Sequence, residues 1–420
     1  MNGARGSFEK YAVIVIADDL TGAADTGIRF SSIVEDMWLT PSGASCLQED
    51  FFEEGRTKGL AVFTDSRHFG AREARRALRG AFEDTGLKGE IVYKKVDSTL
   101  RGQVGAEVSE VLALTGKKIA LIAPTSVEQG RTVRNGLLFL HDVPVAETEV
   151  GKDPRTPLKT SNVVDIVSGP EKLQARLLDL STLSREKEAL DALLDSWSSD
   201  SPCLVVCEAV TREDLKIIAA LAARPDCLPV GSAGLAREVV ELLSSRKKTM
   251  IDRPRSGTFA GRKLWFCGTA ARVTRVQGDR LAAETGMPVL TLSEEEVKNG
   301  ERLSQWIEES LRALRKPDAE LLIRVGEEQM NPTAILEAMR VIVRKLASGV
   351  RIDNFFLSGG DTANVVLSEL EQYPLKLEEE FLPGLIHSQN VRTGQNFFTK
   401  SGGFGGDEVL LHLHQYLMEH

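Results

Sequence analysis

Short runs of β-branched and aliphatic residues alternate with longer amphipathic stretches along most of this chain. The strands predicted from these runs in the first third are YAVIVIA (11–17), LAVFTDS (60–66), IVYKKV (91–96) and KKIALIAP (117–124). The segments between them have the apolar spacing of helices. Strand–helix–strand repetition requires parallel sheets with helices on their faces. We therefore expect an α/β fold in which ligands bind beyond the carboxyl ends of the strands.

A polar, basic stretch with Pro and Gly interrupts this alternation at residues 244–263, and a second alternating series begins with KLWFCGTA (263–270). Such a stretch is typical of a linker. We expect an N-terminal domain over residues 1–246, a linker over 247–262 and a C-terminal domain over 263–420. Two lobes of this kind, each a mainly parallel sheet flanked by helices, would leave a cleft between them that closes on a ligand.

Composition excludes several classes of protein. The net charge of −9 argues against a nucleic-acid partner. No segment has the roughly 18 consecutive apolar residues of a membrane helix, and the N-terminus has no secretion signal, so we expect a cytoplasmic protein. The five cysteines are odd in number and show no CxxC spacing, which fits a reducing compartment better than a disulfide framework or a zinc ribbon.

The first motif that could carry chemistry is VIVIADDLTGAADTG (13–27). Asp18 and Asp19 directly follow a hydrophobic strand, Thr21 can cap the next helix, and Asp25 lies further along that helix. A carboxylate at this edge can bind a sugar hydroxyl, hold a metal ion or accept a proton. The alternative is that one Asp caps the helix while the other is solvated, but three acids in one segment favour a functional role.

The second motif, YKKVDSTLRGQVGAE (93–107), joins a strand end to a helix through a turn rich in hydrogen-bond donors. Its candidate site residues are Lys95, Asp97, Ser98, Arg101 and Gly102. Alternation along the strand places Lys95 and Asp97 on one face and Lys94 on the other. Hydroxyls, a helix N-terminus and an arginine together can bind an anion. The alternative is a helix cap beside a surface arginine.

Three glycine-containing turns follow predicted strands of the C-terminal domain. Ser358-Gly359-Gly360 precedes a helix expected to begin at Asp361 or Thr362, and FFTKSGGFGGDE (397–408) contains Gly402 and Gly403. Gly268 and Thr269 end a third strand. Glycines before a helix let backbone N–H groups converge on a phosphate, although a tight structural turn would also explain one such motif. Three of them in one lobe favour a nucleotide-phosphate site.

Several of these motifs occur in a fixed order, namely ADDLTGAADTG, KKVDSTLRG, GSAGLA, SGGDTANVV and TKSGGFG. Together they resemble the four-carbon acid sugar kinase family, which includes D-threonate, D-erythronate and 3-oxo-tetronate kinases. Residues 123–157 are similar to the family as well, so the resemblance covers essentially the whole chain. It implies an N-terminal substrate-binding domain, a C-terminal nucleotide-binding domain, and ATP as phosphoryl donor to a terminal hydroxyl of a short sugar acid.

The resemblance also implies site residues. The sugar acid would bind among Asp18, Asp19, Asp25, Lys95, Asp97, Ser98, Arg101 and Gly102. ATP would bind among Thr269, Gly359, Gly360, Asp361, Thr362, Gly402 and Gly403. Mg²⁺ would bridge the phosphates; the sequence fixes no ligand set for it, and Asp361 is the candidate ligand.

For the reaction we expect Asp18 or Asp19 to orient the attacking hydroxyl and accept its proton, with Lys95 as the alternative stabiliser of charge. Arg101 and the Ser98 hydroxyl would hold the substrate carboxylate. The main alternative is a non-catalytic sugar-acid-binding or sensor protein using the same cleft. An NAD-dependent oxidoreductase is a weaker alternative because its dinucleotide fingerprint is absent. The expected partner is a small sugar acid, and a homodimer is left open.

Overall fold

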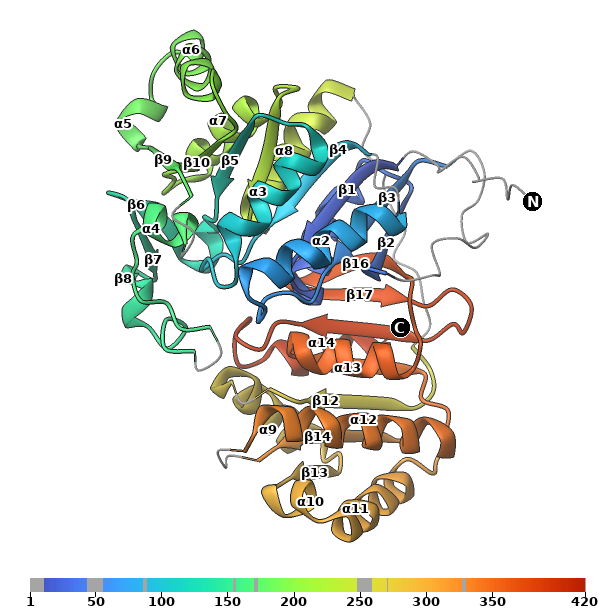
Figure 1. Ribbon diagram of the computed structural model, residues 1–420. Coiled ribbons are helices and arrows are strands. Elements are labelled where there is room, and N and C mark those ends of the chain that lie inside the picture. Colours follow the sequence, from blue (N-terminus) through green and yellow to red (C-terminus); the bar gives the residue numbers. More distant parts are fainter. Residues whose placement is uncertain are drawn as a thin grey trace, which may run out of the picture. The chain divides into compact units, whose positions relative to one another are not determined.

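The computed structural model describes residues 11–43, 56–85, 89–153, 156–169, 173–247, 259–269, 271–326 and 330–419. The chain divides into two compact units, Met1–Asp252 and Arg253–His420, and each has strands, helices and a hydrophobic core of its own (Figure 1). Residues 248–258 of the predicted linker lie outside the described residues. On either side of them, helix α8 ends at Lys247 and strand β12 begins at Lys263.

The main sheet of the first unit is parallel at every pairing and has the strand order β2-β3-β1-β4-β11-β5-β10-β9. Its strands are β1 (Tyr11–Ala17), β2 (Asp36–Pro41), β3 (Lys58–Phe63), β4 (Gly89–Lys95), β5 (Ile119–Ala123), β9 (Ala175–Leu178), β10 (Cys203–Cys207) and β11 (Cys227–Gly231). The central strands are apolar along nearly their whole length because helices cover both faces of the sheet.

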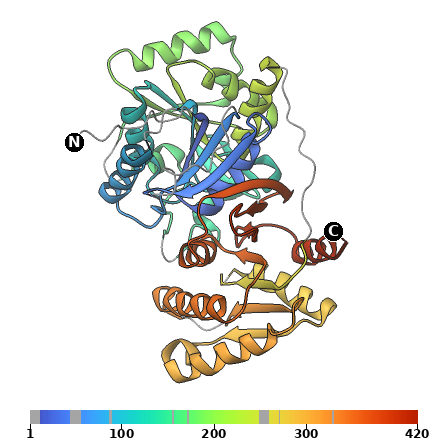
Figure 2. The ribbon, with the colours of Figure 1, turned by 90° about the vertical axis from the view of Figure 1, so that its right-hand side faces the viewer.

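The helices of this unit form two layers. They are α1 (Leu20–Phe30), α2 (Ala71–Thr85), α3 (Val104–Thr115), α4 (Val163–Ser168), α5 (Leu180–Leu183), α6 (Lys187–Ser198), α7 (Arg212–Ala222) and α8 (Ala233–Lys247). On one face α2 packs on α3, and α3 on α4; on the other, α8 packs between α1 and α7 (Figure 2).

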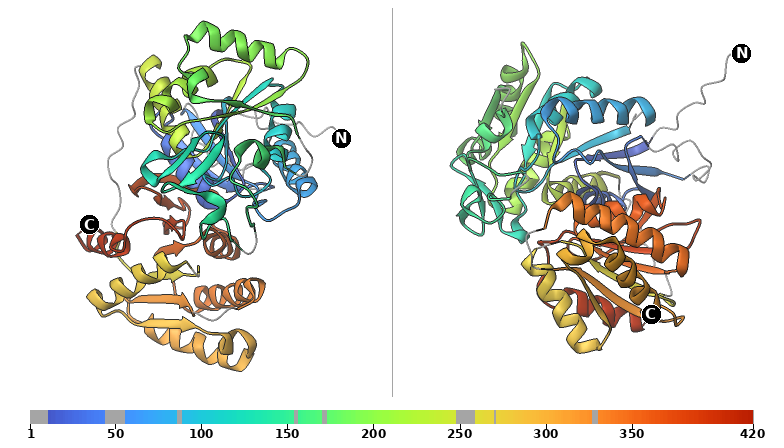
Figure 3. Two further views of the ribbon diagram at one scale, coloured as in Figure 1. Left: turned by 90° about the vertical axis from the view of Figure 1, so that its left-hand side faces the viewer. Right: turned by 60° about the horizontal axis from the view of Figure 1, so that its bottom comes forward.

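A small antiparallel sheet, β6 (Arg131–Arg134), β7 (Leu137–Leu140) and β8 (Val143–Pro144), lies beside the main sheet (Figure 3). Val133 of β6 pairs with Ala209, two residues beyond the end of β10. The small sheet is therefore attached at the carboxyl edge of the main sheet, where the α/β rule places ligands.

The second unit has the strand order β13-β14-β12-β15-β18-β17-β16. Pairings are parallel from β13 to β18, whereas β18, β17 and β16 pair antiparallel, so the sheet is only partly parallel. Its strands are β12 (Lys263–Cys267), β13 (Val289–Leu292), β14 (Glu320–Val325), β15 (Asn354–Ser358), β16 (Leu375–Leu382), β17 (Leu385–Gln389) and β18 (Asn396–Lys400).

Helices again cover both faces of this sheet. They are α9 (Arg272–Thr285), α10 (Glu294–Lys298), α11 (Gly300–Ala313), α12 (Pro332–Gly349), α13 (Gly360–Glu369) and α14 (Val409–Glu419). α9 packs with α14 on one face, while α11, α12 and α13 pack in a row on the other (Figure 2). Trp265, Phe356 and Phe398 stack across neighbouring strands in the core, with ring centroids 3.7 and 4.8 Å apart.

Two expectations from composition can be compared with the described residues. None of their helices is long and apolar enough to span a bilayer. The cysteines among them, Cys203, Cys207, Cys227 and Cys267, are free and buried. Cys46 lies outside the described residues.

Candidate functional sites

Two acidic side chains at the end of β1 are held by one arginine from the neighbouring β3–α2 connection. Arg67 donates to Asp18 from Nε (2.7 Å) and Nη2 (3.0 Å), and to Asp19 from Nη1 (3.0 Å) and Nη2 (2.8 Å). Burial would raise the pKa of Asp18, but the charge and hydrogen bonds of Arg67 outweigh it and lower that pKa. The two predicted acids thus share one guanidinium, which favours the ionised form of Asp18.

Arg67 is not among the site residues predicted from the sequence. Register explains its place: Ala17 of β1 pairs with Phe63 of β3, so the residues after both strands meet at one edge. The backbone N–H of Ser66 donates to the Asp18 carbonyl at 3.0 Å, which fixes the connection that carries Arg67. The strand-end rule that singled out Asp18 applies equally to the TDSR segment after β3, and it could have identified this arginine.

The cap of helix α1 is Asp19, so the prediction of Thr21 as the cap was wrong. Asp19 has extended backbone and accepts from the N–H of Gly22 at 3.1 Å. The helix begins at Leu20, which places Thr21 inside its first turn, where the hydroxyl donates to Asp19 at 2.7 Å. Asp19 therefore accepts four hydrogen bonds, two from the helix start and two from Arg67.

The turn after β4 is organised around Asp97. Arg101 pairs with Asp97 through Nε (2.9 Å) and Nη2 (3.2 Å), and the Thr99 hydroxyl donates to the same carboxylate. Burial would raise the pKa of Asp97, but the charges of Arg101, Arg67 and Lys95 hold it well below its usual range. Because its guanidinium is bound to Asp97 and also approaches Asp153 at 3.4 Å, Arg101 is largely neutralised within the protein.

The charge of Lys95, at the same edge, helps to lower the pKa values of Asp18 and Asp97. Its side chain is 6% exposed, and among the described residues its ammonium makes no hydrogen bond and no ion pair. It lies over the start of helix α1, since a Cβ added to Gly22 would be 2.8 Å from Lys95 Nζ. The nearby Ser98 hydroxyl, also buried, makes no hydrogen bond to a described residue. A lysine that makes no ion pair with a described residue and lies beside a helix N-terminus favours an anionic ligand.

Lys94 points to the opposite side, as predicted from alternation. It is fully buried and pairs with Glu107 of α3 at 2.8 Å. Glu107 also accepts from the Ser66 hydroxyl at 2.7 Å. This buried pair therefore bonds to the residue before Arg67 in the chain and to the Lys95 carbonyl.

Of two further predicted site residues, Gly102 lies close to the Asp18 carboxylate and, among the described residues, Asp25 is not bonded to the Arg67 cluster. Gly102 has a φ of +89°, and a Cβ there would be 3.3 Å from Asp18 Oδ2, so the turn approaches the acids as predicted. Asp25 is buried in α1 and pairs with Arg29 at 3.4 Å. Within the described residues no hydrogen bond or ion pair joins Asp25 to the Arg67 cluster.

In the second unit, the three predicted glycine turns come together. Cys267, Ser358 and Lys400 are paired across the neighbouring parallel strands β12, β15 and β18. The turns that follow them therefore lie side by side at one edge. Thr269 lies between the other two turns: its Cβ would be 3.1 Å from a Cβ on Gly359 and 3.2 Å from a Cβ on Gly402.

Helix α13 begins within this cluster. Gly359 is its cap with a φ of +106°, a conformation that favours glycine, and the helix starts at Gly360, one residue earlier than expected. Thr362 is buried in the first turn, whereas Asp361 is exposed. The N-terminus of α13 and the two adjoining turns form a concentration of backbone N–H groups suited to phosphate.

Lys400 lies beneath these turns. Its Nζ donates to the carbonyls of Ser401 (2.9 Å) and Phe404 (3.0 Å). Burial lowers the pKa of Lys400 to about 8. The described residues contain no group of three or more His, Cys, Asp or Glu side chains placed for a metal ion. A Mg²⁺ ion here would depend on phosphate oxygens and water, with Asp361 as the nearest predicted carboxylate.

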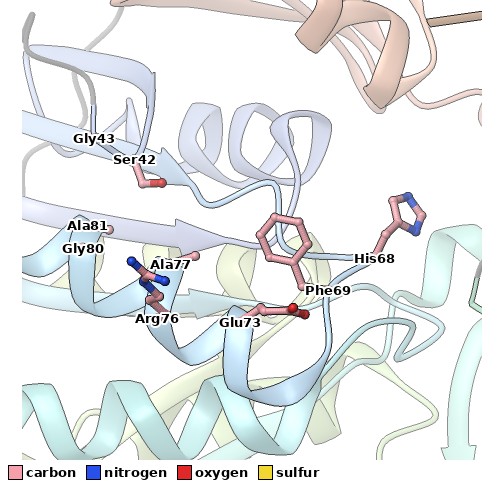
Figure 4. Close-up of a pocket in the computed structure, with 9 residues that line it drawn as sticks. All are labelled: Ser42, Gly43, His68, Phe69, Glu73, Arg76, Ala77, Gly80 and Ala81. Carbon is pink, nitrogen blue, oxygen red and sulfur yellow. The ribbon is translucent and has the colours of Figure 1, made fainter. Parts of the chain in front are cut away.

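A cavity of about 540 Å³ opens between the end of β2 and helix α2 in the first unit. Figure 4 shows its lining, which includes His68, Phe69, Glu73 and Arg76. None of the predicted site residues lines it.

The chain is similar to curated bacterial kinases over nearly its full length. It is 29% identical to the D-threonate kinase of Salmonella typhimurium over 97% of this chain and 98% of that protein. It is 25% identical to the D-erythronate kinase of Heliobacterium modesticaldum (97% and 97%) and 24% identical to the 3-oxo-tetronate kinase of Methylobacterium radiotolerans (93% and 96%).

Solved structures have the same fold. A Salmonella typhimurium LT2 protein matches with a TM-score of 0.77 at 20% identity, over 97% of this chain and 99% of that one. A Haemophilus influenzae protein matches with a TM-score of 0.67 at 20% identity, over 96% and 100%. Residues 13–239, more than half of the chain, match the sugar-binding N-terminal domain family, and residues 264–410 match the nucleotide-binding C-terminal domain family. The chain therefore belongs to the sugar-binding N-terminal domain family and joins that domain to a nucleotide-binding C-terminal domain.

Proposed function

We propose that this chain is an ATP-dependent kinase of four-carbon sugar acids, which phosphorylates a terminal hydroxyl. The observation that carries the proposal is the match over nearly the full chain to relatives named as kinases of D-threonate, D-erythronate and 3-oxo-tetronate. The two units support it separately, because one has a lysine that makes no ion pair with a described residue at the expected ligand edge, and the other has three N–H-rich turns. A cytoplasmic location and a homodimer stay predictions from the sequence.

In this proposal the substrate carboxylate binds Lys95 and the Ser98 hydroxyl, the two donors without described partners. The main role of Arg101 is then to hold the turn through its ion pair with Asp97, and its contact with the substrate carboxylate is secondary. The lysine ammonium is a compact positive charge. Because the Lys95 side chain is largely removed from water, binding of an anionic carboxylate to it is favourable.

Asp18 is the better candidate for the base. Asp19 accepts four hydrogen bonds, whereas Asp18 accepts two from Arg67, so Asp18 keeps acceptor capacity for a substrate hydroxyl. The hydroxyl oxygen would form a bond to the γ-phosphorus, the bond from phosphorus to the β,γ-bridging oxygen would break, and the hydroxyl proton would pass to Asp18. Phosphoryl transfer depends mainly on such positioning.

ATP phosphates would bind the N–H groups of the Gly359–Thr362 helix start and of the Gly402-Gly403 turn, beside Thr269. Mg²⁺, when bound, would shield the phosphate charge, with Asp361 as its protein ligand. The exposed position of Asp361 at the N-terminus of α13 fits that role.

The first test is ADP release from Mg-ATP in a coupled assay, against D- and L-threonate, D- and L-erythronate and 3-oxo-tetronates. We expect release that depends on one of these acids. Acid binding without turnover would support a sugar-acid-binding protein instead. Absence of both turnover and ATP binding would exclude the kinase.

The second test replaces Lys95 with Met. We expect the KM for the acid to rise about tenfold or more, with the KM for ATP unchanged, because one charge-assisted contact is lost. Lys117→Met is the matched control, since Lys117 bonds to the Pro225 carbonyl at the opposite edge of the sheet. An unchanged acid KM in Lys95→Met would remove Lys95 from the carboxylate site.

A further inference from the structure

The loop after β18, residues 401–406, is held through its carbonyl oxygens by buried side chains. Thr274 of α9 donates to the Gly402 carbonyl at 2.8 Å, and Lys400 donates to the Ser401 carbonyl at 2.9 Å. Gln277, one turn further along α9, donates to the carbonyls of residues 404, 405 and 406 at 2.9–3.3 Å. All three side chains are at least 98% buried.

These bonds set the direction of the N–H groups in the same loop. In a trans peptide the C=O and N–H of one unit point in opposite directions. Lys400 and Thr274 draw the carbonyls of Ser401 and Gly402 toward the protein, so the N–H groups of Gly402 and Gly403 must point away from these two side chains. Within the described residues neither N–H donates a hydrogen bond.

Thr274 also connects this loop to the next turn. Its hydroxyl lies 2.8 Å from the Ser358 hydroxyl, at the end of β15 and directly before the Gly359 cap of α13. One hydroxyl thereby holds two of the three turns in a fixed relation. Because the one hydroxyl proton of Thr274 goes to the Gly402 carbonyl, the Ser358 hydroxyl donates in the Thr274–Ser358 contact, and Thr274 can serve both partners.

We propose that Thr274 and Lys400 are positioning residues for the nucleotide phosphates: by fixing the carbonyls of the 401–402 segment, they orient the Gly402 and Gly403 N–H groups toward the phosphate chain. The inference rests on the proposed function, because it assumes that ATP binds this unit. It adds residues that contact no phosphate themselves and act through the backbone.

The test compares Thr274→Val with Thr274→Ser in the full-length protein. Thr274→Val has nearly the same shape but no hydroxyl, and we expect about tenfold weaker binding of ATP and of ADP, with adenosine binding unchanged. The KM for ATP should rise while the KM for the acid stays constant. Thr274→Ser keeps the hydroxyl and should restore ATP affinity to within about twofold.

Thr285→Val is the matched control on the same helix, because the Thr285 hydroxyl donates to the Leu281 carbonyl at 2.8 Å and accepts from the Met287 N–H at 3.3 Å, and among the described residues makes no hydrogen bond to the 401–406 loop. It should leave ATP affinity unchanged. If Thr274→Val does not fold, Lys400→Met should show the same selective loss for ATP and ADP. Equal ATP affinity in wild type and Thr274→Val, or equal losses for ATP and adenosine, would overturn the proposal. A wild-type protein that binds no ATP would instead reject the proposed function.

Discussion

At the scale of single residues, Arg67 is what allows the buried Asp18 to be ionised beside Asp19. It makes four hydrogen bonds to Asp18 and Asp19, and Asp18 is 3% exposed. Without a cation, burial and mutual repulsion would both favour the protonated acids. The ionised state of this edge therefore depends on a residue of a neighbouring loop.

Arg67→Met should lower the free energy of unfolding by about 3–5 kcal/mol at pH 7, because it leaves a buried carboxylate unpaired. The loss should be smaller at pH 5, since the pKa of Asp18 rises in the variant and the acid protonates more readily. Urea unfolding followed by circular dichroism at both pH values measures this. Equal losses at pH 5 and pH 7 would contradict the assigned charge state.

Asp97 predicts a separate dependence on pH. Its folded-state pKa lies well below its usual value, so the unfolded chain binds its proton first as the pH falls. The stability that Asp97 contributes is complete above its unfolded pKa of about 4 and is lost progressively below it. We expect Asp97→Asn to flatten the decrease in unfolding free energy between pH 5 and pH 3, measured by urea titration. A decrease as steep as that of wild type would show that other acids cause it.

At the scale of elements, the buried Lys94–Glu107 pair joins the end of β4 to helix α3. Lys94 Nζ also donates to the Lys95 carbonyl at 3.0 Å, and Glu107 accepts from Ser66, next to Arg67. The pair therefore connects the strand that carries Lys95, the helix behind it and the loop that carries Arg67. Removing one partner would leave an uncompensated charge in the core.

Glu107→Leu is expected to lower the free energy of unfolding by about 3–5 kcal/mol, and the double variant Lys94→Met/Glu107→Leu by less. Arg79→Met is the control on the same helix pair: Arg79 bonds to Glu110 of α3 at 2.6 Å but is 57% exposed. It should cost much less than Glu107→Leu, because an ion pair with an exposed partner contributes little to stability. Chemical denaturation of the three variants measures these changes in the free energy of unfolding. A double variant less stable than Glu107→Leu would contradict the pairing.

Elements were easier to predict from sequence than their contacts. Apolar runs located β1, β4 and β12 to within a few residues because a strand covered by helices on both faces must be apolar. The start of α1 was misplaced, since the choice between Asp19 and Thr21 as cap depends on the backbone angles of Asp19. The Arg67 clamp was missed because it depends on which strands are neighbours, and the sequence does not state strand order.

At the scale of the whole molecule, each unit has its own candidate ligand edge, which is formed by residues that follow parallel strands. The three glycine turns could be predicted to act together from sequence, because all follow strands of one sheet. Their convergence on Thr269 could not, since it requires that β12, β15 and β18 be adjacent and in register. We expect the two ligands to stabilise the protein separately.

Saturating ATP at about 100 times its Kd should stabilise the native protein by about 2.7 kcal/mol. Gly402→Ala should lose this effect and keep stabilisation by the acid, because its new Cβ would lie 2.8 Å from Thr269 Oγ1 and Cγ2. Gly406→Ala, whose Cβ meets nothing within 4 Å, should keep both effects. Thermal unfolding with each ligand measures the difference. Loss of both effects in Gly402→Ala would point to general misfolding.

The buried Lys94–Glu107 pair also bears on how chains of this kind can diverge. A change at either position alone creates a buried charge without a counter-charge, whereas a joint change to apolar residues can be nearly neutral. Intermediates with one substitution would be selected against. Across related sequences these two positions should therefore vary together, and a lysine at the first without an acid at the second should be rare unless another anion has moved into the core.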